Sequence, residues 1–192
     1  MKEQIGSPGQ IVLLNGAPRS GKSSIAAAIQ ATFEGVWMNL GVDLWMKATP
    51  PPYLPGLGLR PGGERPDLEP LVGAQYRALY DSIAAHCRLG LNVVADVGHY
   101  SPSLFADCRA RLEGLPVLWV GVRCPLEIIL ERRRQTGYPW RTESGAVPPP
   151  VLRWQEEVHR VAPYDLEMDT SLLKPAECAE EILRVLTESQ TQ

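Results

Sequence analysis

Residues 16–23 form a glycine-rich segment with the spacing G-x-x-x-x-G-K-[ST]. An apolar run precedes the segment and a helical pattern follows it, which is the context that a phosphate-binding loop requires. In such a loop, backbone N–H groups and the N-terminus of the next helix together bind an anion. A chance glycine-rich turn is the weaker alternative. The expected nucleotide-binding residues are Gly16, Ala17, Pro18, Arg19, Ser20, Gly21, Lys22, Ser23 and Ser24.

Two side chains at the end of this loop have chemistry of their own. The ammonium group of Lys22 would reach the β- and γ-phosphates of ATP, and the hydroxyl group of Ser23 would bind Mg²⁺. Asp96 follows the apolar run 93–95, at the usual place of an acid that holds the same metal ion through water. An ordinary turn residue is the alternative for Asp96. We expect Ser23 and Asp96 to form the metal site.

Asp43 follows a second apolar run, residues 36–40, and so lies at the edge where open α/β sheets bind ligands. A carboxylate there could take the proton of an acceptor hydroxyl group during phosphoryl transfer. It could equally be the N-cap of a helical turn over residues 44–47, and spacing alone leaves the two roles even. His99, at the same edge, is a weaker candidate for the acceptor pocket, because a lone histidine is more often a hydrogen-bonded structural residue.

Three consecutive arginines, Arg132, Arg133 and Arg134, end a predicted helix. Cations are favourable near a helix C-terminus, so a solvated surface is one explanation. In the other, a lid arginine neutralises charge on the transferred phosphoryl group. Three successive helical residues span about 200° and cannot all face one site. We expect the catalytic arginine to be Arg132, Arg134 or, in the loop that follows, Arg141.

Two irregular segments, 49–70 and 135–150, do not fit a helix or a strand. The first holds seven prolines and four glycines. Long irregular loops in compact domains are usually lids or binding loops, so we expect an acceptor-side loop at 49–70 and a lid at about 135–150. Aromatic side chains could line the acceptor pocket, although buried aromatic residues more often belong to the core. The candidates are Trp45, Tyr53, Trp140 and Trp154.

Apolar runs alternate with helical patterns along the chain, which predicts βαβ units and a parallel sheet. Strands are expected at 10–15, 36–40, 92–97, 116–123 and 165–169. Helices are expected at 22–33, 71–89, 103–113, 125–137, 151–160 and 174–187. Together with the phosphate loop, these patterns predict one three-layer α/β P-loop domain over residues 1–192, with a five-stranded parallel sheet between helices.

The composition excludes several classes of protein. The chain has 192 residues, 44% of them hydrophobic, and a net charge of −3 at pH 7. A general nucleic-acid binder would show a basic excess, and a disordered chain would be less apolar. The first apolar run is too short for a signal peptide or a membrane span. We therefore expect a cytoplasmic protein with no nucleic-acid or membrane partner, and leave a homo-oligomer open.

A phosphate loop by itself does not distinguish a GTPase, a motor ATPase and a small-molecule kinase. A GTPase would show an Asn-Lys-x-Asp segment and an Asp-x-x-Gly switch, and the sequence contains neither. Motor and signalling proteins tend to need additional modules, for which this chain is short. A kinase is the class that remains.

Several longer segments resemble the chloramphenicol phosphotransferases of the P-loop kinase superfamily. They are IVLLNG at 11–16, GVD at 41–43, VLWVGVRC at 117–124, VH at 158–159 and YDLEMDT at 164–170. The resemblance implies ATP-dependent phosphorylation of a small-molecule hydroxyl group, as in chloramphenicol 3-O-phosphotransferase. It also implies that Asp43 is the base and that Asp169 and Thr170 lie near the adenine. The third strand ends in Ala95-Asp96, where the antibiotic kinase has paired aspartates.

Two other functions stay open for the same scaffold. One is a kinase of another metabolite, of the sugar-acid or nucleoside type. The other is a regulator that binds ATP without transferring its phosphoryl group. The presence of Asp43 beside a complete phosphate loop favours an enzyme.

Overall fold

A five-stranded parallel sheet forms the centre of the protein, for which the computed structural model describes residues 7–54, 65–160 and 163–189. The strands are β1 (Ile11–Asn15), β2 (Trp37–Asn39), β3 (Asn92–Val97), β4 (Val117–Arg123) and β5 (Leu166–Asp169). Their order is β2-β3-β1-β4-β5, and all neighbours are parallel. The chain runs first to one side of β1 and then to the other, an arrangement that opens a crevice at the carboxyl ends of the strands.

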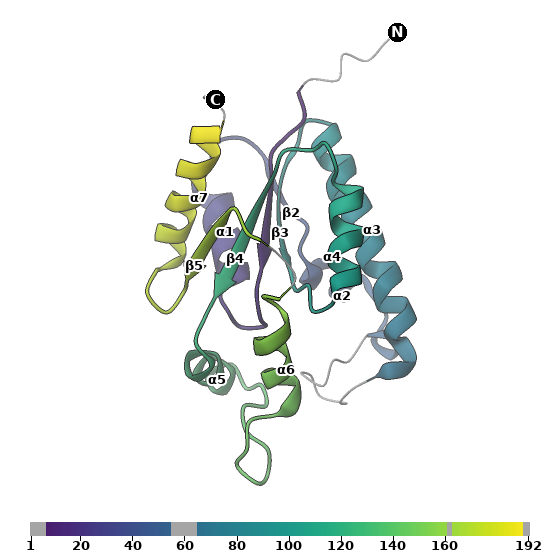
Figure 1. The fold of residues 1–192 in the computed structure, drawn as a ribbon, viewed down its shortest axis with the longest axis vertical. Helices are drawn as coiled ribbons and strands as arrows, with labels where there is room; N and C mark the ends of the chain where they lie inside the picture. Colours follow the sequence, from purple (N-terminus) through teal and green to yellow (C-terminus); the bar gives the residue numbers. More distant parts are fainter. Residues whose placement is uncertain (1–6, 55–64, 161–162, 190–192) are drawn as a thin grey trace.

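Helices cover both faces of the sheet and its carboxyl edge (Figure 1). They are α1 (Lys22–Thr32), α2 (Val42–Ala48), α3 (Glu69–Arg88), α4 (Pro102–Arg111), α5 (Leu126–Gln135), α6 (Pro149–Glu157) and α7 (Pro175–Ser189). α1 and α7 pack on one face, and α3 and α4 pack on the other. α5 and α6 lie beyond the carboxyl ends of the strands. The predicted three-layer fold is confirmed.

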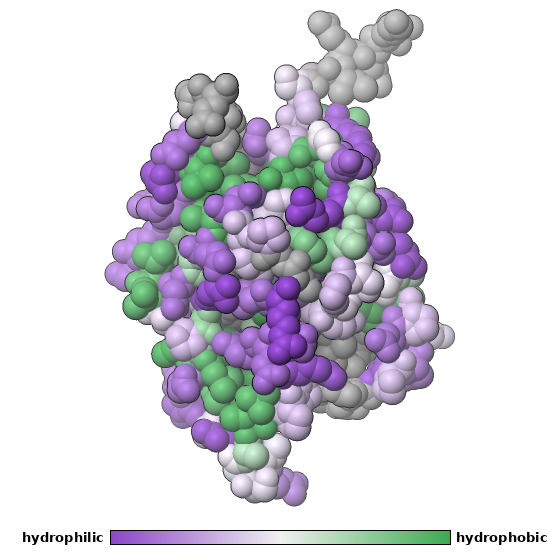
Figure 2. All heavy atoms as spheres, viewed as in Figure 1, coloured by the Kyte–Doolittle hydropathy of each residue, from purple (hydrophilic) through white to green (hydrophobic). Residues whose placement is uncertain are grey.

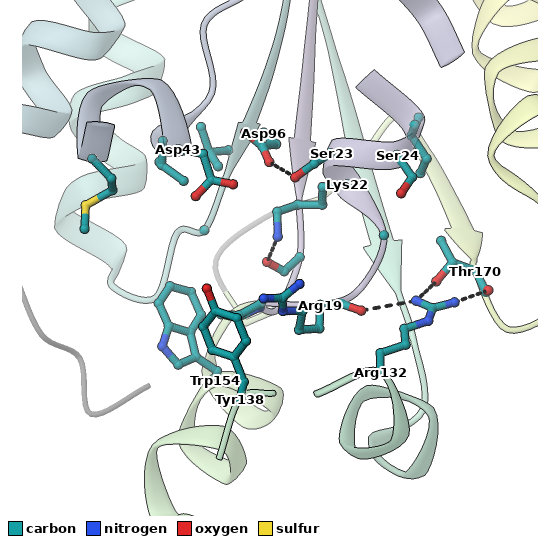
Figure 3. A pocket seen from close by; sticks show the side chains of 18 of the residues that line it. Arg19, Lys22, Ser23, Ser24, Asp43, Asp96, Arg132, Tyr138, Trp154 and Thr170 are labelled. Atoms are coloured by element: carbon teal, nitrogen blue, oxygen red, sulfur yellow. Dashed lines mark hydrogen bonds between the residues drawn. The ribbon is translucent and has the colours of Figure 1, made fainter. Parts of the chain in front are cut away.

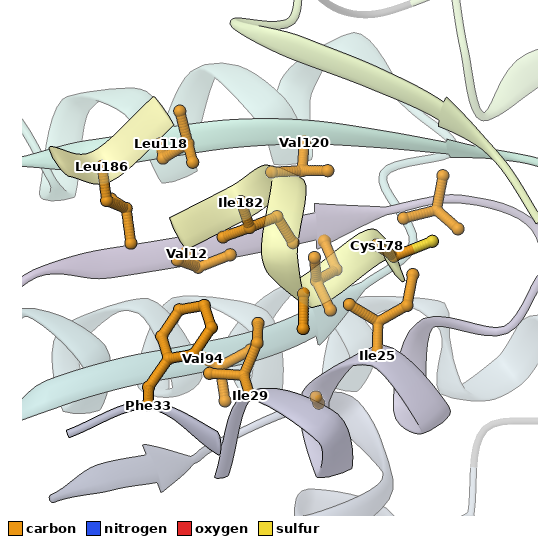
Figure 4. Close-up of a cluster of buried hydrophobic side chains, with 14 of the residues drawn as sticks. Val12, Ile25, Ile29, Phe33, Val94, Leu118, Val120, Cys178, Ile182 and Leu186 are labelled. Atoms are coloured by element: carbon orange, nitrogen blue, oxygen red, sulfur yellow. The ribbon is translucent and has the colours of Figure 1, made fainter. Parts of the chain in front are cut away.

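Side chains that alternate along each strand divide the core into two apolar layers. From β1, Val12 and Leu14 pack with residues of α1 and α7 in the first layer, which Figure 4 shows. Ile11 and Leu13 pack with residues of α3 and α4 in the second layer. Because the central strands are buried on both faces, they are continuous apolar runs in the sequence.

A third apolar cluster joins α5 and α6 to the loop between β1 and α1. Its buried members are Ala17, Cys124, Ile129, Leu130, Val151, Trp154 and Val158. The cluster holds both helices against that loop. The C-terminal end of α5 is therefore positioned beside the loop.

The two irregular segments, 49–70 and 135–150, are shorter in the structure than the sequence predicts. Segment 49–70 contains two 3₁₀ turns, Pro51–Tyr53 and Pro66–Leu68, and its last two residues begin α3. The remainder of the expected acceptor-side loop, 55–64, lies outside the described residues. The expected lid at 135–150 loses both ends, because Gln135 ends α5 and Pro149 begins α6.

Hydrophilic side chains predominate on the face drawn in Figure 2, and apolar side chains lie there in separate groups. Within the described part of the chain, no helix is both long and apolar enough to cross a membrane.

Candidate active site

Two glycines of the loop between β1 and α1 cannot be replaced without strain, one because of close packing and the other because of its backbone conformation. A Cβ atom at Gly16 would lie 2.4 Å from the carbonyl oxygen of Val122 in β4. Gly21, the N-cap of α1, has φ of +104°, a conformation that glycine adopts without steric cost. The loop therefore ends at a helix N-terminus, whose N–H groups carry partial positive charge and favour anions.

Lys22 lies at the first position of α1, and only 9% of its surface is exposed. Its Nζ donates hydrogen bonds to the carbonyl oxygens of Gly16 at 2.8 Å and Ala17 at 3.0 Å. Burial lowers the pKa of Lys22, and the carboxylates of Asp96 and Asp43 oppose that shift. The side chain thus curls back over the loop and holds its ammonium group near two carboxylates.

Ser23 and Asp96 form the pair that was expected to hold a metal ion. The Ser23 hydroxyl group donates a hydrogen bond of 2.7 Å to Asp96 Oδ2. Asp96 lies in β3 and is 5% exposed. Its other oxygen, Oδ1, lies against Gly41, where an added Cβ atom would be 1.6 Å away. The absence of a side chain at Gly41 therefore leaves the space that this carboxylate occupies.

Asp43 is in the first turn of α2 and points into the cavity opposite Lys22 (Figure 3). The N-cap of α2 is Gly41, so the alternative that Asp43 is the N-cap is wrong. The helix places Asp43 at its second position, where a carboxylate is favourable but is not needed to begin the helix.

One cavity of about 560 Å³ contains all these groups. At one end it is lined by the phosphate loop with Ser24, Arg132 and Thr170, and Figure 3 shows this end to the right of Lys22. The other end is largely apolar. The side chains there belong to Val42, Trp45, Met46, Val72, Gln75, Tyr76, Leu79 and Trp154. The cavity is large enough for two small ligands whose reacting groups meet near Lys22 and Asp43.

The candidate arginines separate clearly in the structure. Arg132 lines the cavity and donates from Nη2 to the Thr170 carbonyl oxygen at 2.8 Å and from Nη1 to the Arg19 carbonyl oxygen at 3.1 Å. Arg134 pairs with Glu131 on the exposed side of α5, and Arg141 donates to the Gly145 carbonyl oxygen within its own exposed loop. Neither Arg134 nor Arg141 lines the cavity.

Arg133, which is not among the predicted catalytic arginines, lines the cavity and is only 2% exposed. Its Nε donates to the Pro139 carbonyl oxygen at 2.6 Å, and its guanidinium group lies 5.9 Å from the centre of the Tyr138 ring. Arg133 follows the buried Ile129 by four residues and Leu130 by three, so it shares their face of the helix. That spacing was a signal in the sequence that could have identified it.

Of the two candidates at the end of β5 and just after it, only one lines the cavity. Thr170 lines the cavity, and its hydroxyl group donates to the Ser20 carbonyl oxygen at 2.5 Å. Asp169 does not line it, because its carboxylate accepts hydrogen bonds from the backbone N–H and hydroxyl group of Ser171. The structure therefore brings Thr170 to the phosphate loop and gives Asp169 a turn-forming role.

Only some of the aromatic candidates line the cavity. Trp45 and Trp154 line the cavity, whereas Trp140 is exposed in the loop after α5. Tyr53 lines only a second, neighbouring pocket, which shares Trp45 with the cavity. Trp154 packs so closely on Gly98 that a Cβ there would lie 2.7 Å from the indole ring. Met46, Gln75, Tyr76 and Tyr138 also line the cavity and were missed. They come from three different parts of the chain, α2, α3 and the loop after α5, and no local pattern marks them.

His99 lies in the core rather than in the cavity. It is fully buried, its Nε2 is 2.8 Å from the Tyr80 hydroxyl oxygen, and its ring packs edge-on against Phe105. Burial lowers the pKa of His99 to about 3. The structural role, not the acceptor-pocket role, is the one that the structure supports.

This burial predicts a loss of stability in mild acid. Unfolded histidine binds a proton below a pKa of about 6.5, whereas folded His99 stays neutral, so stability falls as the pH falls from that value. The expected loss between pH 7.5 and pH 5.0 is about 2 kcal/mol from this residue. Urea unfolding at both pH values measures it. In His99→Phe the pH-dependent loss should shrink by this amount, and an unchanged slope would contradict the prediction.

Comparison with known proteins identifies the family. The chain matches the family model of chloramphenicol phosphotransferase-like proteins over residues 9–187. The chain belongs to this family. A Mycobacterium tuberculosis relative named "Putative O-phosphotransferase" is 30% identical over 191 residues, which cover 91% of this chain and 80% of the relative. The resemblance inferred from the sequence is confirmed.

Solved structures with the same fold include several kinases. Shikimate kinase from Acinetobacter baumannii superposes with a TM-score of 0.65 at 14% identity, over 98% of this chain and 97% of that one. The APS kinase of Mycobacterium tuberculosis gives 0.63 at 15% identity, over 95% and 99%. These likenesses show a P-loop kinase fold. Together with the family, they support a phosphotransferase of the kinase type.

Proposed function

We propose that this protein is an ATP-dependent kinase that phosphorylates a hydroxyl group of a neutral, largely apolar small molecule. The observation that carries the proposal is the placement of Lys22, Asp43 and the Ser23–Asp96 pair around one cavity with an apolar far end. A phosphate loop, a carboxylate facing it and room for an acceptor are the parts that phosphoryl transfer needs.

In the proposed reaction, the loop amides and Lys22 hold the β- and γ-phosphates of ATP. Asp43 accepts a hydrogen bond from the acceptor hydroxyl group and takes its proton as the acceptor oxygen bonds to the γ-phosphorus. The bond from that phosphorus to the β–γ bridging oxygen breaks, and ADP leaves. Burial of Lys22 strengthens its attraction for phosphate, because the surrounding medium screens the charge less.

The residues present fit Mg²⁺. Ser23 and Asp96 offer hard oxygen ligands 2.7 Å apart, and Gly41 leaves the room that the Asp96 carboxylate occupies. When bound, the ion would neutralise charge on the phosphates. The chain's own contribution is to hold the hydroxyl and carboxylate groups together at the end of the loop.

We predict that Gly41→Ala weakens this metal site. The added Cβ atom would lie 1.6 Å from Asp96 Oδ1, so the carboxylate must move. Displacing the support of a metal ligand typically costs about 10–100-fold in metal affinity, and we expect a rise of that size in the Mg²⁺ concentration for half-maximal turnover. Gly73→Ala in α3, where the new Cβ has only ordinary contacts, is the matched control. Equal metal titrations for both variants would contradict the prediction.

The lining of the cavity supports a neutral acceptor. Among the described residues that line it, the cations are Arg19, Lys22, Arg132 and Arg133, which come from the phosphate loop and the end of α5. No described cation lines the end formed by α2 and α3. Among the described residues at that end, a sugar acid would find no cation to pair with its carboxylate, which is unfavourable. An alcohol with an aromatic or aliphatic body would instead pack against Trp45, Tyr76 and Trp154.

A transfer assay with radiolabelled ATP tests the function. The purified protein is incubated with Mg²⁺, γ-labelled ATP and one acceptor at a time: chloramphenicol, other neutral aromatic alcohols, gluconate and a nucleoside. We expect labelled product from neutral alcohols and none from gluconate. Labelling of gluconate or the nucleoside would favour a metabolite kinase. ATP binding with no transfer to any acceptor would favour a non-catalytic regulator.

A further inference from the structure

Arg19, in the middle of the phosphate loop, has a backbone conformation that is unusual for its type. Its φ is +72°, and no other described non-glycine residue has a positive φ. This left-handed conformation is strained for a residue with a Cβ atom, and such strain is found mostly at functional sites. Glycine would adopt it freely. The side chain therefore needs an explanation other than the geometry of the turn.

The guanidinium group of Arg19 lies over the face of the Tyr138 ring, 4.1 Å from its centre. Figure 3 shows it between Tyr138 and the loop, on the cavity side. Within the described part of the chain, this group forms no hydrogen bond or ion pair. Arg19 is half-buried and lines the cavity. An aromatic face attracts a cation but leaves its N–H donors unused.

The other arginines near the cavity are already committed to the protein. Arg132 donates hydrogen bonds to the carbonyl oxygens of Thr170 and Arg19, and so supports the loop. Arg133 is anchored to the Pro139 carbonyl oxygen. Arg133 also lies near Arg19, whose like charge helps burial to lower the pKa of Arg133. An anion between these two cations would relieve their repulsion.

We propose that Arg19, and not an arginine at the end of α5, supplies the guanidinium group that neutralises the transferred phosphoryl group, with Tyr138 as its resting contact. The proposal rests on the proposed kinase function. As the acceptor oxygen bonds to the γ-phosphorus and the bond to ADP breaks, Arg19 donates hydrogen bonds to the oxygens of the group in transit. The acceptor proton goes to Asp43. Arg19 comes from the same loop as the phosphate-binding amides, so it needs no lid closure to arrive.

The alternative is that Arg19 only clasps the lid through Tyr138. A clasp would support the whole nucleotide site, so its loss would weaken ADP and AMPPNP binding alike. A group that contacts the γ-phosphate would affect AMPPNP alone, because ADP has none. Tryptophan fluorescence reports both titrations, since Trp45 and Trp154 line the cavity.

The experiment uses Arg19→Gly in the full chain. This substitution removes the side chain, and glycine adopts the positive φ without strain. We expect an unchanged or higher Tm, ADP affinity within about threefold of wild type, and a loss of about tenfold or more in the affinity of AMPPNP relative to ADP. Transfer to an acceptor, or ATP hydrolysis in its absence, should fall by about 10²–10³-fold. Arg19→Lys should recover part of the AMPPNP preference, because it keeps the charge but not the planar fork.

Arg184→Gln is the control, because Arg184 pairs with Glu181 and Glu188 on the exposed side of α7 and does not line the cavity. An AMPPNP-to-ADP ratio and a turnover equal to those of wild type would overturn the role of Arg19, and an equal loss of both nucleotides would overturn it in favour of a clasp. Wild-type protein that binds neither nucleotide would instead overturn the kinase function itself.

Discussion

Replacing Lys22 with methionine is expected to lower turnover by roughly 10³-fold or more, the scale on which positioned cations contribute to phosphoryl transfer. Methionine keeps an unbranched side chain of nearly the same length and lacks the ammonium group. Nucleotide affinity should fall as well, because charge-assisted hydrogen bonds to the phosphates are lost. We expect only a modest change in Tm. The variant loses two hydrogen bonds to the loop carbonyls, but it no longer buries a charged group.

Three measurements on this variant separate its effects: turnover, ATP affinity and thermal unfolding. Lys47→Met is the matched control, since Lys47 is exposed on α2 and does not line the cavity. Lys47→Met should behave as wild type in all three. Turnover by Lys22→Met within tenfold of wild type, in a folded protein, would remove Lys22 from the mechanism.

The phosphate loop was predictable because its chemistry is contiguous. Spacing, a preceding strand and a following helix are all local properties, and the structure reproduces each of them at residues 11–32. The strands were predictable for a similar reason, since burial on both faces leaves an apolar run in the sequence. Asp96 was located by its place at the end of such a run, and it meets Ser23 directly.

The arginines of α5 were not assigned to the cavity or the surface from the local sequence pattern. The sequence gives three successive side chains, but only the rotation of α5 about its axis decides which of them face the cavity. Packing of Ile129 and Leu130 into the third apolar cluster sets that rotation. It turns Arg133 inward and leaves Arg134 on the surface with Glu131. Arg133 was missed because the prediction did not consider which arginine shares the apolar face of α5.

The acceptor end was harder to predict, because its lining comes from separate segments. Met46, Gln75 and Tyr138 meet only after the chain has folded around β1 and β3. The stacking of Arg19 on Tyr138 joins residues 119 positions apart. Neither residue type indicates, from the sequence, that the two side chains stack. Sequence alone thus predicted the candidate reaction centre and left the lining of the proposed acceptor end open.

Asp43→Asn is expected to lower turnover by about 10²-fold while leaving nucleotide binding near the wild-type level. The amide keeps the size and most of the hydrogen-bonding geometry of the carboxylate but loses its basicity. A general base contributes about 10²–10⁴-fold, and the loose transition state of phosphoryl transfer places the loss at the low end of that range. ATP affinity should hold, because the phosphate loop and not the start of α2 binds the phosphates.

The competing role for Asp43 is a favourable charge in the first turn of α2, since Gly41 is the N-cap. That role predicts a stability loss of about 0.3–1 kcal/mol and no change in rate. The control is Asp107→Asn in α4, whose carboxylate lies 3.8 Å from Arg77 Nη1 on the surface. A large loss of rate with little change in Tm, in Asp43→Asn alone, assigns the proton-accepting role. If turnover on an accepted alcohol stays within threefold of wild type, Asp43 stabilises its helix and the hydroxyl group loses its proton without it.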